Sequence, residues 1–192
     1  MMSQAVELLQ SGPQLIMSLP ANDPELARAA MQGGADILKV HLRVHHAASG
    51  TRFGTLDEER QRLTEILELF PGPVGIVAGA EEPATSREMN ELREMGFDFF
   101  DLYASQMPAW MWHVGGMGKV VALESGQYSV HQAIALENLG VDVIEAAIIP
   151  HEGYGKPLTV ADLAAYRDLH DTVDVPIIVP TQRNIRPEEA SL

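Results

Sequence analysis

Seven short apolar segments recur along the chain, and each is followed by a segment with helical signals. They recur at intervals of about 25 to 35 residues, which is typical of successive right-handed βαβ units around a parallel sheet. We therefore expect an α/β fold. The expected strands are residues 14–19, a strand that begins at residue 35, and residues 74–80, 97–103, 119–125, 141–149 and 175–181.

The chain of 192 residues is short for a closed barrel of eight such units, which normally needs about 250 residues and at least about 200. We predict a single domain over residues 1–192, a (β/α)8 TIM-type barrel truncated after strand seven. An open doubly wound sheet is the alternative. A sheet that does not close leaves strands one and seven as exposed edges, which favours a lost C-terminal segment, a partner that covers them, or disorder. We also expect a homo-oligomer.

Helix signals separate the expected strands. Capping boxes occur at Thr55 with Glu58 and at Thr85 with Glu88, and each precedes an apolar helical stripe. A short tryptophan-containing helix is expected at residues 108–114, and a last helix is expected from residue 188 onward.

Composition excludes several classes of function. The 27 acidic and 13 basic residues give a formal net charge of -14, which argues against nucleic acid or an anionic membrane as the main partner. The absence of cysteine excludes disulfides, thiolate chemistry and Cys-ligated zinc. With no leader-like N-terminus and no run of roughly 20 apolar residues, we expect a cytoplasmic protein without a membrane span.

The second strand carries an unusual set of polar residues. Lys39, His41 and Arg43 alternate with Leu38, Val40 and Leu42, so the two sets point to opposite faces. Burying a lysine and a histidine in a helix-covered strand requires partners or a wet site. Lys39 is expected to be a general base, a Schiff-base nucleophile or an electrostatic stabiliser; the alternative is a structural salt bridge. His41 is either an acid/base group or a hydrogen-bonded core histidine.

Polar residues at the carboxyl ends of the other strands complete the candidate catalytic set, because ligands of parallel βα folds bind at those ends. Asp101 and Glu124 could share a proton, or bind a divalent metal with His41 or His151. No metal-binding spacing such as HExxH is present, so we expect no cofactor and keep a metal as the alternative. Glu145 lies deeper in its strand and is expected to be a partner of Lys39.

Two loops predict binding of an anion. The stretches HHAASGTRFG and HEGYGKP combine backbone N–H groups with Arg52 and Lys156. Neither matches a known phosphate-loop pattern, and plain turns would look similar. The predicted ligand- or phosphate-binding residues are Arg43, Arg52, His151, Lys156, Gln182 and Arg183.

The stretches VDVIEAAIIPHEGYGKPLTVADLAAYRDL and VPIIVPTQRNIRPEEA resemble the ribulose-phosphate-binding barrel superfamily, and the resemblance covers roughly residues 140–190. The resemblance is nearest to its N-acetylmannosamine-6-phosphate 2-epimerase branch, and GADILKVHL adds a weaker likeness to the ribulose-phosphate 3-epimerases. It implies a barrel and a phosphorylated ligand. The epimerase catalytic residues are not matched: IVAGAE lacks the lysine, IVPTQ lacks the acidic residue, and HLRVHH lacks the aspartate of the metal-binding pattern.

These observations predict an isomerase, epimerase or lyase that transfers a proton next to the carbonyl of a small phosphorylated sugar or related anionic metabolite. Lys39 would be the main catalytic group, assisted by Asp101, Glu124 and His41. A non-catalytic barrel used as a binding or assembly module is the alternative, and a metal-dependent aldolase or hydrolase is the third. Enclosure of Lys39 by Asp101 and Glu145 would favour the non-catalytic alternative.

Overall fold

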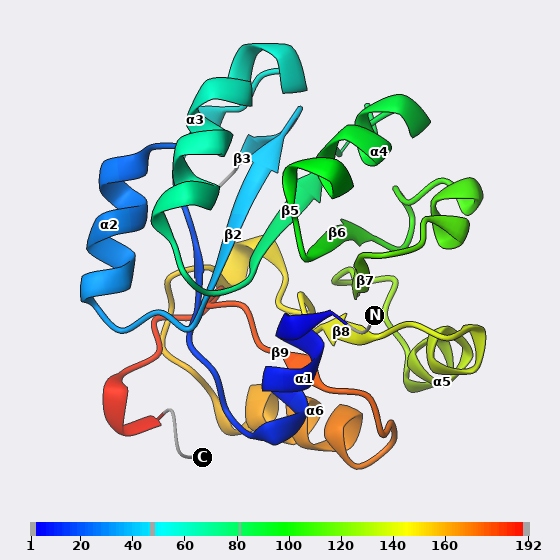
Figure 1. Cartoon of the computed structure of the whole chain (residues 1–192). Coiled ribbons are helices and arrows are strands. Elements are labelled where there is room, and N and C mark those ends of the chain that lie inside the picture. Colours follow the sequence, from blue (N-terminus) through cyan, green and yellow to red (C-terminus); the bar gives the residue numbers. More distant parts are fainter. Residues whose placement is uncertain (1–2, 47–48, 81, 190–192) are drawn as a thin grey trace. The chain divides into compact units, whose positions relative to one another are not determined.

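The computed structural model describes residues 3–46, 49–80 and 82–189. The chain groups into two compact units. The first runs to Leu102 and includes Gln106–Lys119, and the second comprises Tyr103–Ser105 and the chain from Val120 onward. In both units parallel strands alternate with helices (Figure 1).

The strands of the first unit follow one another in chain order, β1-β2-β5-β6. The β1–β2, β2–β5 and β5–β6 pairs are all parallel, as the strand and helix alternation predicts. The elements are α1 (Gln4–Ser11), β1 (Ile16–Ser18), α2 (Pro24–Gln32), β2 (Ile37–Leu42), β3 (His45–His46), β4 (Thr51–Arg52), α3 (Leu56–Leu69), β5 (Val74–Ala78), α4 (Ser86–Met95), β6 (Phe99–Tyr103) and the 3-10 helix η1 (Ala109–His113).

The two faces of strand β2 differ in polarity, as the alternation predicts. Leu38, Val40 and Leu42 are buried in an apolar core with residues of α2, α3 and α4 such as Leu63 and Leu92. The alternate side chains, including the buried Lys39 and His41, therefore lie on the face of the sheet away from these helices.

A two-residue antiparallel ladder follows β2, where the sequence predicted a basic loop. Strand β3 pairs with β4, with His45 opposite Arg52. Arg43, just after β2, has a φ of 51°, a left-handed conformation that non-glycine residues adopt uncommonly. The ladder of β3 and β4 thus begins just after the carboxyl end of strand β2.

Helix α1 is attached to the start of β6 by a single carboxylate. Asp98 accepts hydrogen bonds from the hydroxyl of Ser3 and from the backbone N–H groups of Gln4 and Ala5. These are donors that the first turn of a helix leaves without an intrahelical partner. Asp98 therefore caps a helix that lies more than 90 residues earlier in the chain.

The second unit contains the strands β7-β8-β9, again in chain order and parallel. Strand β8 is shorter than the predicted residues 141–149, and β9 is shorter than residues 175–181. Pro176 and Pro180 flank β9 and lack the N–H that would continue the ladder. The elements are β7 (Gly118–Ala122), α5 (Val130–Leu139), β8 (Val143–Glu145), η2 (His151–Gly153), α6 (Val160–His170), β9 (Ile177–Ile178) and η3 (Pro187–Glu189).

No helix in the described ranges is long and apolar enough to cross a membrane.

Candidate functional site

The clearest candidate site is a buried ion pair in the first unit. The ammonium Nζ of Lys39 lies 2.8 Å from Oδ2 of Asp101, and the two side chains are 9% and 4% exposed. Lys39 is on β2 and Asp101 is on β6, with β5 between them. Both residues were predicted to be catalytic, and the salt bridge between them was the structural alternative for Lys39.

The register of the sheet explains how the pair forms. Lys39 is aligned with Gly75 of β5, which is aligned with Phe99 of β6; Asp101 lies two residues beyond Phe99. The lysine side chain therefore reaches toward the carboxyl ends of the strands to meet Asp101. Gly75 is required here, because a Cβ would lie 2.0 Å from the ring of Phe99. Phe99 thus provides an apolar neighbour to the charged groups.

His41 lies two residues after Lys39 on β2, and its environment keeps the imidazole neutral. The residue is 2% exposed. Its ring stacks on Phe53 at a centroid distance of 4.6 Å and lies 4.9 Å from the ring of His46. Burial, and then the charges of Lys39 and His46, lower the pKa of His41 to about 3. At neutral pH His41 can donate or accept a hydrogen bond, but it does not carry a proton as an imidazolium.

A clamp that the sequence did not predict holds the backbone of His41. The side-chain amide of Asn22 donates to the carbonyl of His41 at 2.7 Å and accepts from its N–H at 3.2 Å. Asn22 also donates to Glu59 at 3.2 Å, and Glu59 accepts from the N–H of Gly54 at 3.1 Å. Asn22 and Glu59 are buried, so the loop after β1 and the segment after β4 are tied to strand β2.

The two predicted anion-binding arginines of the first unit have different surroundings. Arg43 donates to Glu88 at 2.8 Å and lies 3.5 Å from Glu82. The hydrogen bond to Glu88 is the main reason that the pKa of Arg43 is raised. Arg52, on β4, is exposed and lines a hollow with Phe53.

In the second unit the predicted residues Gln182 and Arg183 join two loops. Gln182 accepts from the N–H of Ile149 at 3.2 Å and donates to the hydroxyl of Tyr154 at 2.7 Å. Arg183 donates to the carbonyl of Gly153 at 2.9 Å and to Asp162, also at 2.9 Å. These bonds hold the HEGYGKP loop against the segment that follows β9. They give both residues a structural task, and anion binding by them stays a prediction.

The remaining candidates of the second unit are spread over its surface and its core. His151 is exposed, and its ring lies 4.8 Å from that of Tyr154. Lys156 is exposed, and Glu145 ends β8 and is buried. Glu124 accepts a hydrogen bond from Ser105 at 2.9 Å. No group of three or more His, Cys, Asp or Glu side chains in the described part of the chain could hold a metal ion.

Three solved structures resemble the chain at low sequence identity. The N-acetylmannosamine-6-phosphate 2-epimerase from Clostridium perfringens has a TM-score of 0.62 and 17% identity, over 97% of this chain and 83% of that one. A 2,3-dimethylmalate lyase, a member of the PEP mutase/isocitrate lyase superfamily, has a TM-score of 0.59 and 17% identity, over 100% and 84%. The phosphoenolpyruvate phosphomutase from Streptomyces platensis subsp. rosaceus has a TM-score of 0.58 and 14% identity, over 98% and 77%.

The likeness shows the fold. The chain is a (β/α) barrel in which the described residues supply seven parallel strands, so the predicted truncated barrel is confirmed and the open doubly wound alternative is not. The resemblance to an epimerase barrel is confirmed at the level of the fold. No protein-family model matches the sequence, and no curated protein matches it.

Proposed function

We propose that the protein is an enzyme that transfers a proton next to the carbonyl of a small phosphorylated sugar or related metabolite. The observation that carries the proposal is the 2.8 Å contact between Lys39 and Asp101, buried on the polar face of the sheet. Such a reaction needs a base and an electrophilic group. The ion pair supplies both, because the carboxylate can accept the carbon-bound proton while the ammonium stabilises the enolate oxygen.

A purely structural role is a weaker explanation of this pair. A buried salt bridge is often no more stabilising than apolar side chains of similar volume, because both charges lose their hydration. Strands β2, β5 and β6 are already joined by their backbone ladders, so the pair adds no new connection between them. Titratable groups that are buried beside a specific charge partner are candidates for a functional site.

His41 would assist as a neutral group. Because its pKa is about 3, it cannot deliver a proton as an imidazolium at neutral pH. A neutral imidazole can still donate one hydrogen bond to a carbonyl or enolate oxygen. We therefore narrow the predicted acid/base role of His41 to hydrogen-bond donation.

A second candidate is the non-catalytic barrel used as a binding or assembly module. The near-complete burial of the Lys39 side chain, which is 9% exposed, favours it, because a substrate must reach the ammonium for catalysis. The two candidates differ in whether any ligand exchanges a carbon-bound proton on the protein.

The test is hydrogen exchange in D2O. The protein is incubated with sugar phosphates and 2-oxo acids, and loss of the C–H signal next to the carbonyl is followed by proton NMR. We expect exchange of at least one compound, and we expect Asp101→Asn to abolish it. The matched control is Asp162→Asn, which alters another buried carboxylate, one paired with an arginine, in the second unit.

Two outcomes would contradict the enzyme proposal. One is the absence of exchange with every compound in a protein shown to be folded by circular dichroism, which would leave the binding module. The other is exchange that continues at the wild-type rate in Asp101→Asn. Borohydride trapping on Lys39, followed by mass spectrometry, would instead identify an imine mechanism.

A further inference from the structure

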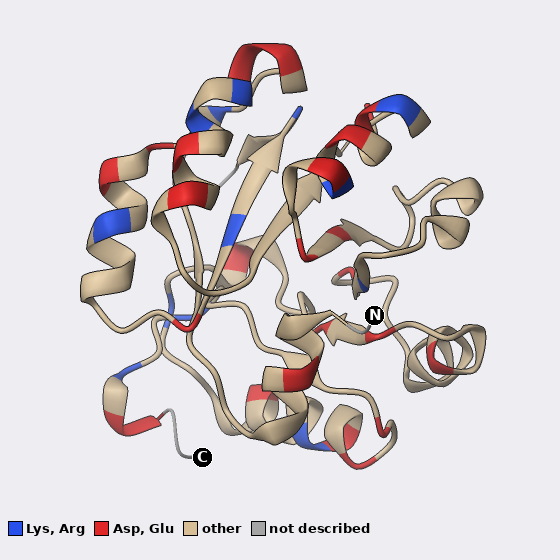
Figure 2. Ribbon diagram, viewed as in Figure 1, with Lys and Arg blue, Asp and Glu red and all other residues tan. Residues whose placement is uncertain are grey.

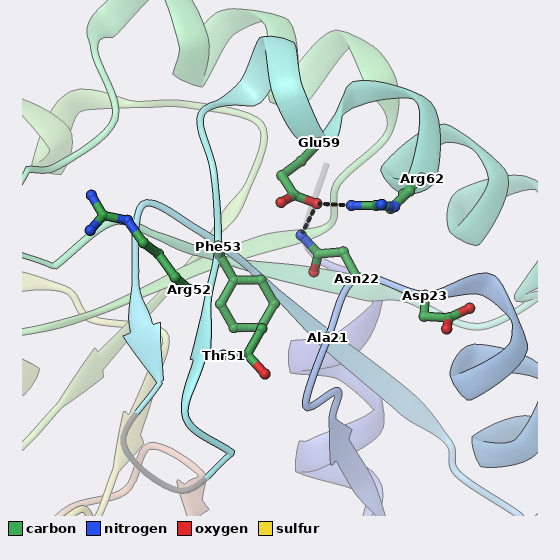
Figure 3. A pocket seen from close by; sticks show the side chains of 8 residues that line it. All are labelled: Ala21, Asn22, Asp23, Thr51, Arg52, Phe53, Glu59 and Arg62. Carbon is green, nitrogen blue, oxygen red and sulfur yellow. Dashed lines mark hydrogen bonds and ion pairs between the residues drawn. The ribbon is translucent and has the colours of Figure 1, made fainter.

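A small pocket lies beside the candidate site, at the carboxyl ends of β1 and β2. It has a volume of about 220 Å³ and is lined by residues of the β1–α2 loop, of β4 and of the first turns of α3. Figure 3 shows the side chains that line it, among them Glu59, Arg62, Asn22, Asp23, Thr51 and the ring of Phe53. The volume is below the roughly 300–1,000 Å³ typical of sites for drug-sized ligands, so a ligand of this pocket would be small.

The inner wall of the pocket is rigidly built. Asn22 and Glu59 are 4% and 7% exposed, and both are fixed by the hydrogen bonds that clamp the backbone of His41. Phe53 lines the pocket and also stacks on the ring of His41. A ligand that contacts Phe53 would therefore contact the ring that stacks on His41. Neither Lys39 nor Asp101 is among the residues that line the pocket.

The rim of the pocket offers charged and polar groups to a ligand. The side chain of Arg62 is 63% exposed, and the contact of its guanidinium with Glu59 is long, at 3.7 Å. A guanidinium has five N–H donors in a planar arrangement that fits carboxylate or phosphate. Asp23 and the hydroxyl of Thr51 border the same hollow and can bind hydroxyl groups. Arg52 also lines the pocket, but its guanidinium points away from Arg62 (Figure 3).

We propose that this pocket is a second ligand site, which binds a small hydroxylated anion through Arg62, with the hydroxyl groups at Asp23 and Thr51. Because the chain carries a net charge of -14, its overall field repels anions. Binding therefore depends on the local guanidinium. The site does not require the proposed reaction, since neither Lys39 nor Asp101 takes part in it.

The experiment is an NMR titration of the full chain with glycerol 3-phosphate, followed in ¹H–¹⁵N spectra. We expect the largest shifts at the Asn22 side-chain amide, at the Phe53 amide and at the Arg62 Nε–H. Arg62→Ala should weaken binding at least tenfold. Arg28→Ala is the matched control, because Arg28 is another exposed arginine, outside this pocket, whose guanidinium also contacts a glutamate.

Inorganic phosphate, titrated in the same way, tests the hydroxyl groups of the ligand and should bind more weakly than glycerol 3-phosphate. Equal affinity for the two compounds would contradict the role given to Asp23 and Thr51. Shifts centred on Lys39 and Asp101 that persist in Arg62→Ala would place the anion at the other site and overturn the proposal. So would the absence of any shift with either compound in the wild-type protein.

Discussion

Two nearly buried ion pairs, one in each unit, differ in what else their members hold. Lys39 and Asp101 lie on two strands that the sheet already joins through β5. Arg183 and Asp162 lie on separate loop and helix segments, with side chains 12% and 10% exposed. Arg183 also donates to the carbonyl of Gly153, and Asp162 accepts from the hydroxyl and N–H of Thr159 at the start of α6.

The second pair is therefore part of the scaffold. Removing it would leave a loop carbonyl and a helix cap without their partners, whereas the ladder of the first unit would survive the loss of Lys39 and Asp101. Burial and distance alone therefore do not separate a structural ion pair from a candidate catalytic one. The second pair is identified as structural because both of its members also bind backbone groups of a loop and of a helix start.

The second unit's arrangement has a counterpart in the first. Glu88 closes the capping box of α4 with Thr85 and also binds Arg43, as Asp162 closes that of α6 and binds Arg183. Desolvation opposes ionisation of both carboxyls, but the hydrogen bonds from threonine and arginine outweigh it and lower the pKa of each. A helix cap that orients a nearby arginine thus occurs in both units.

The largest effect is expected from breaking the two pairs. Lys39→Met alone should lower the free energy of unfolding by about 3–5 kcal/mol, because it removes one member of a buried ion pair. The double variant Lys39→Met/Asp101→Leu should recover most of that loss. The double variant Arg183→Met/Asp162→Leu should not recover the loss of Arg183→Met, since Gly153 and Thr159 also lose partners. Urea unfolding of the six proteins, including the wild type and Asp101→Leu, measures this.

Equal recovery in both double variants would remove the distinction between the two pairs. Recovery in the second unit alone would reverse it and make Lys39–Asp101 the structural pair.

A smaller effect is expected on the pH dependence of stability, and it comes from His41 of the first unit. The folded pKa of His41, about 3, lies below its ordinary value of 6.5, so the unfolded chain binds a proton there more readily. Stability from this residue is complete above pH 6.5 and is lost as the pH falls toward 3, by about 2 kcal/mol at pH 5. The variant His41→Gln should not show this part of the decrease in the free energy of unfolding at low pH. Urea unfolding at pH 7 and pH 5 checks it.

The exposed neighbour His45 provides the control for that experiment, because His45→Gln should keep the wild-type dependence. The same dependence in His41→Gln as in the wild type would contradict a buried neutral imidazole. In Lys39→Met the pKa of His41, read by NMR, should rise, since the ammonium is one cause of its lowering.

The smallest effects are expected at the helix caps. Thr159→Ala and Thr85→Ala should each lower the free energy of unfolding by about 1 kcal/mol. Thr159→Ala should cost more, because the hydrogen bonds of Thr159 are partly buried whereas those of Thr85 are exposed. Thermal unfolding followed by circular dichroism ranks the two. The opposite ranking would show that the cap of α4 supports Arg43 more than the cap of α6 supports Arg183.

Much of the fold could be predicted from the sequence because its signals are local. The capping boxes predicted at Thr55 and Thr85 mark helix starts that the structure contains, and the alternation around Lys39 gives the two faces of β2. Strand lengths at β8 and β9 and the ladder of β3 with β4 were not predicted. They depend on which backbone groups find partners elsewhere in the chain.

The candidate site was predicted in part. Lys39 and Asp101 could be selected because charged residues stand out in buried strands, and their contact was one of the alternatives considered. The clamp of Asn22 and Glu59 could not, because it joins residues 37 positions apart that carry no shared pattern. The position of Asn22 in the loop between β1 and α2 was the only signal. The neutrality of His41 depends on burial by Phe53, which spacing does not reveal.

The bonds between Asp98 and the start of α1 also have a consequence for the order of folding. A helix of eight residues is marginal in water by itself, and its cap comes from a residue more than 90 positions away. The intervening βα units must be in place before that cap exists, because closing so long a loop has an entropic cost that the later contacts must offset. Helix α1 should therefore be among the last elements to form and the first to exchange its amide hydrogens.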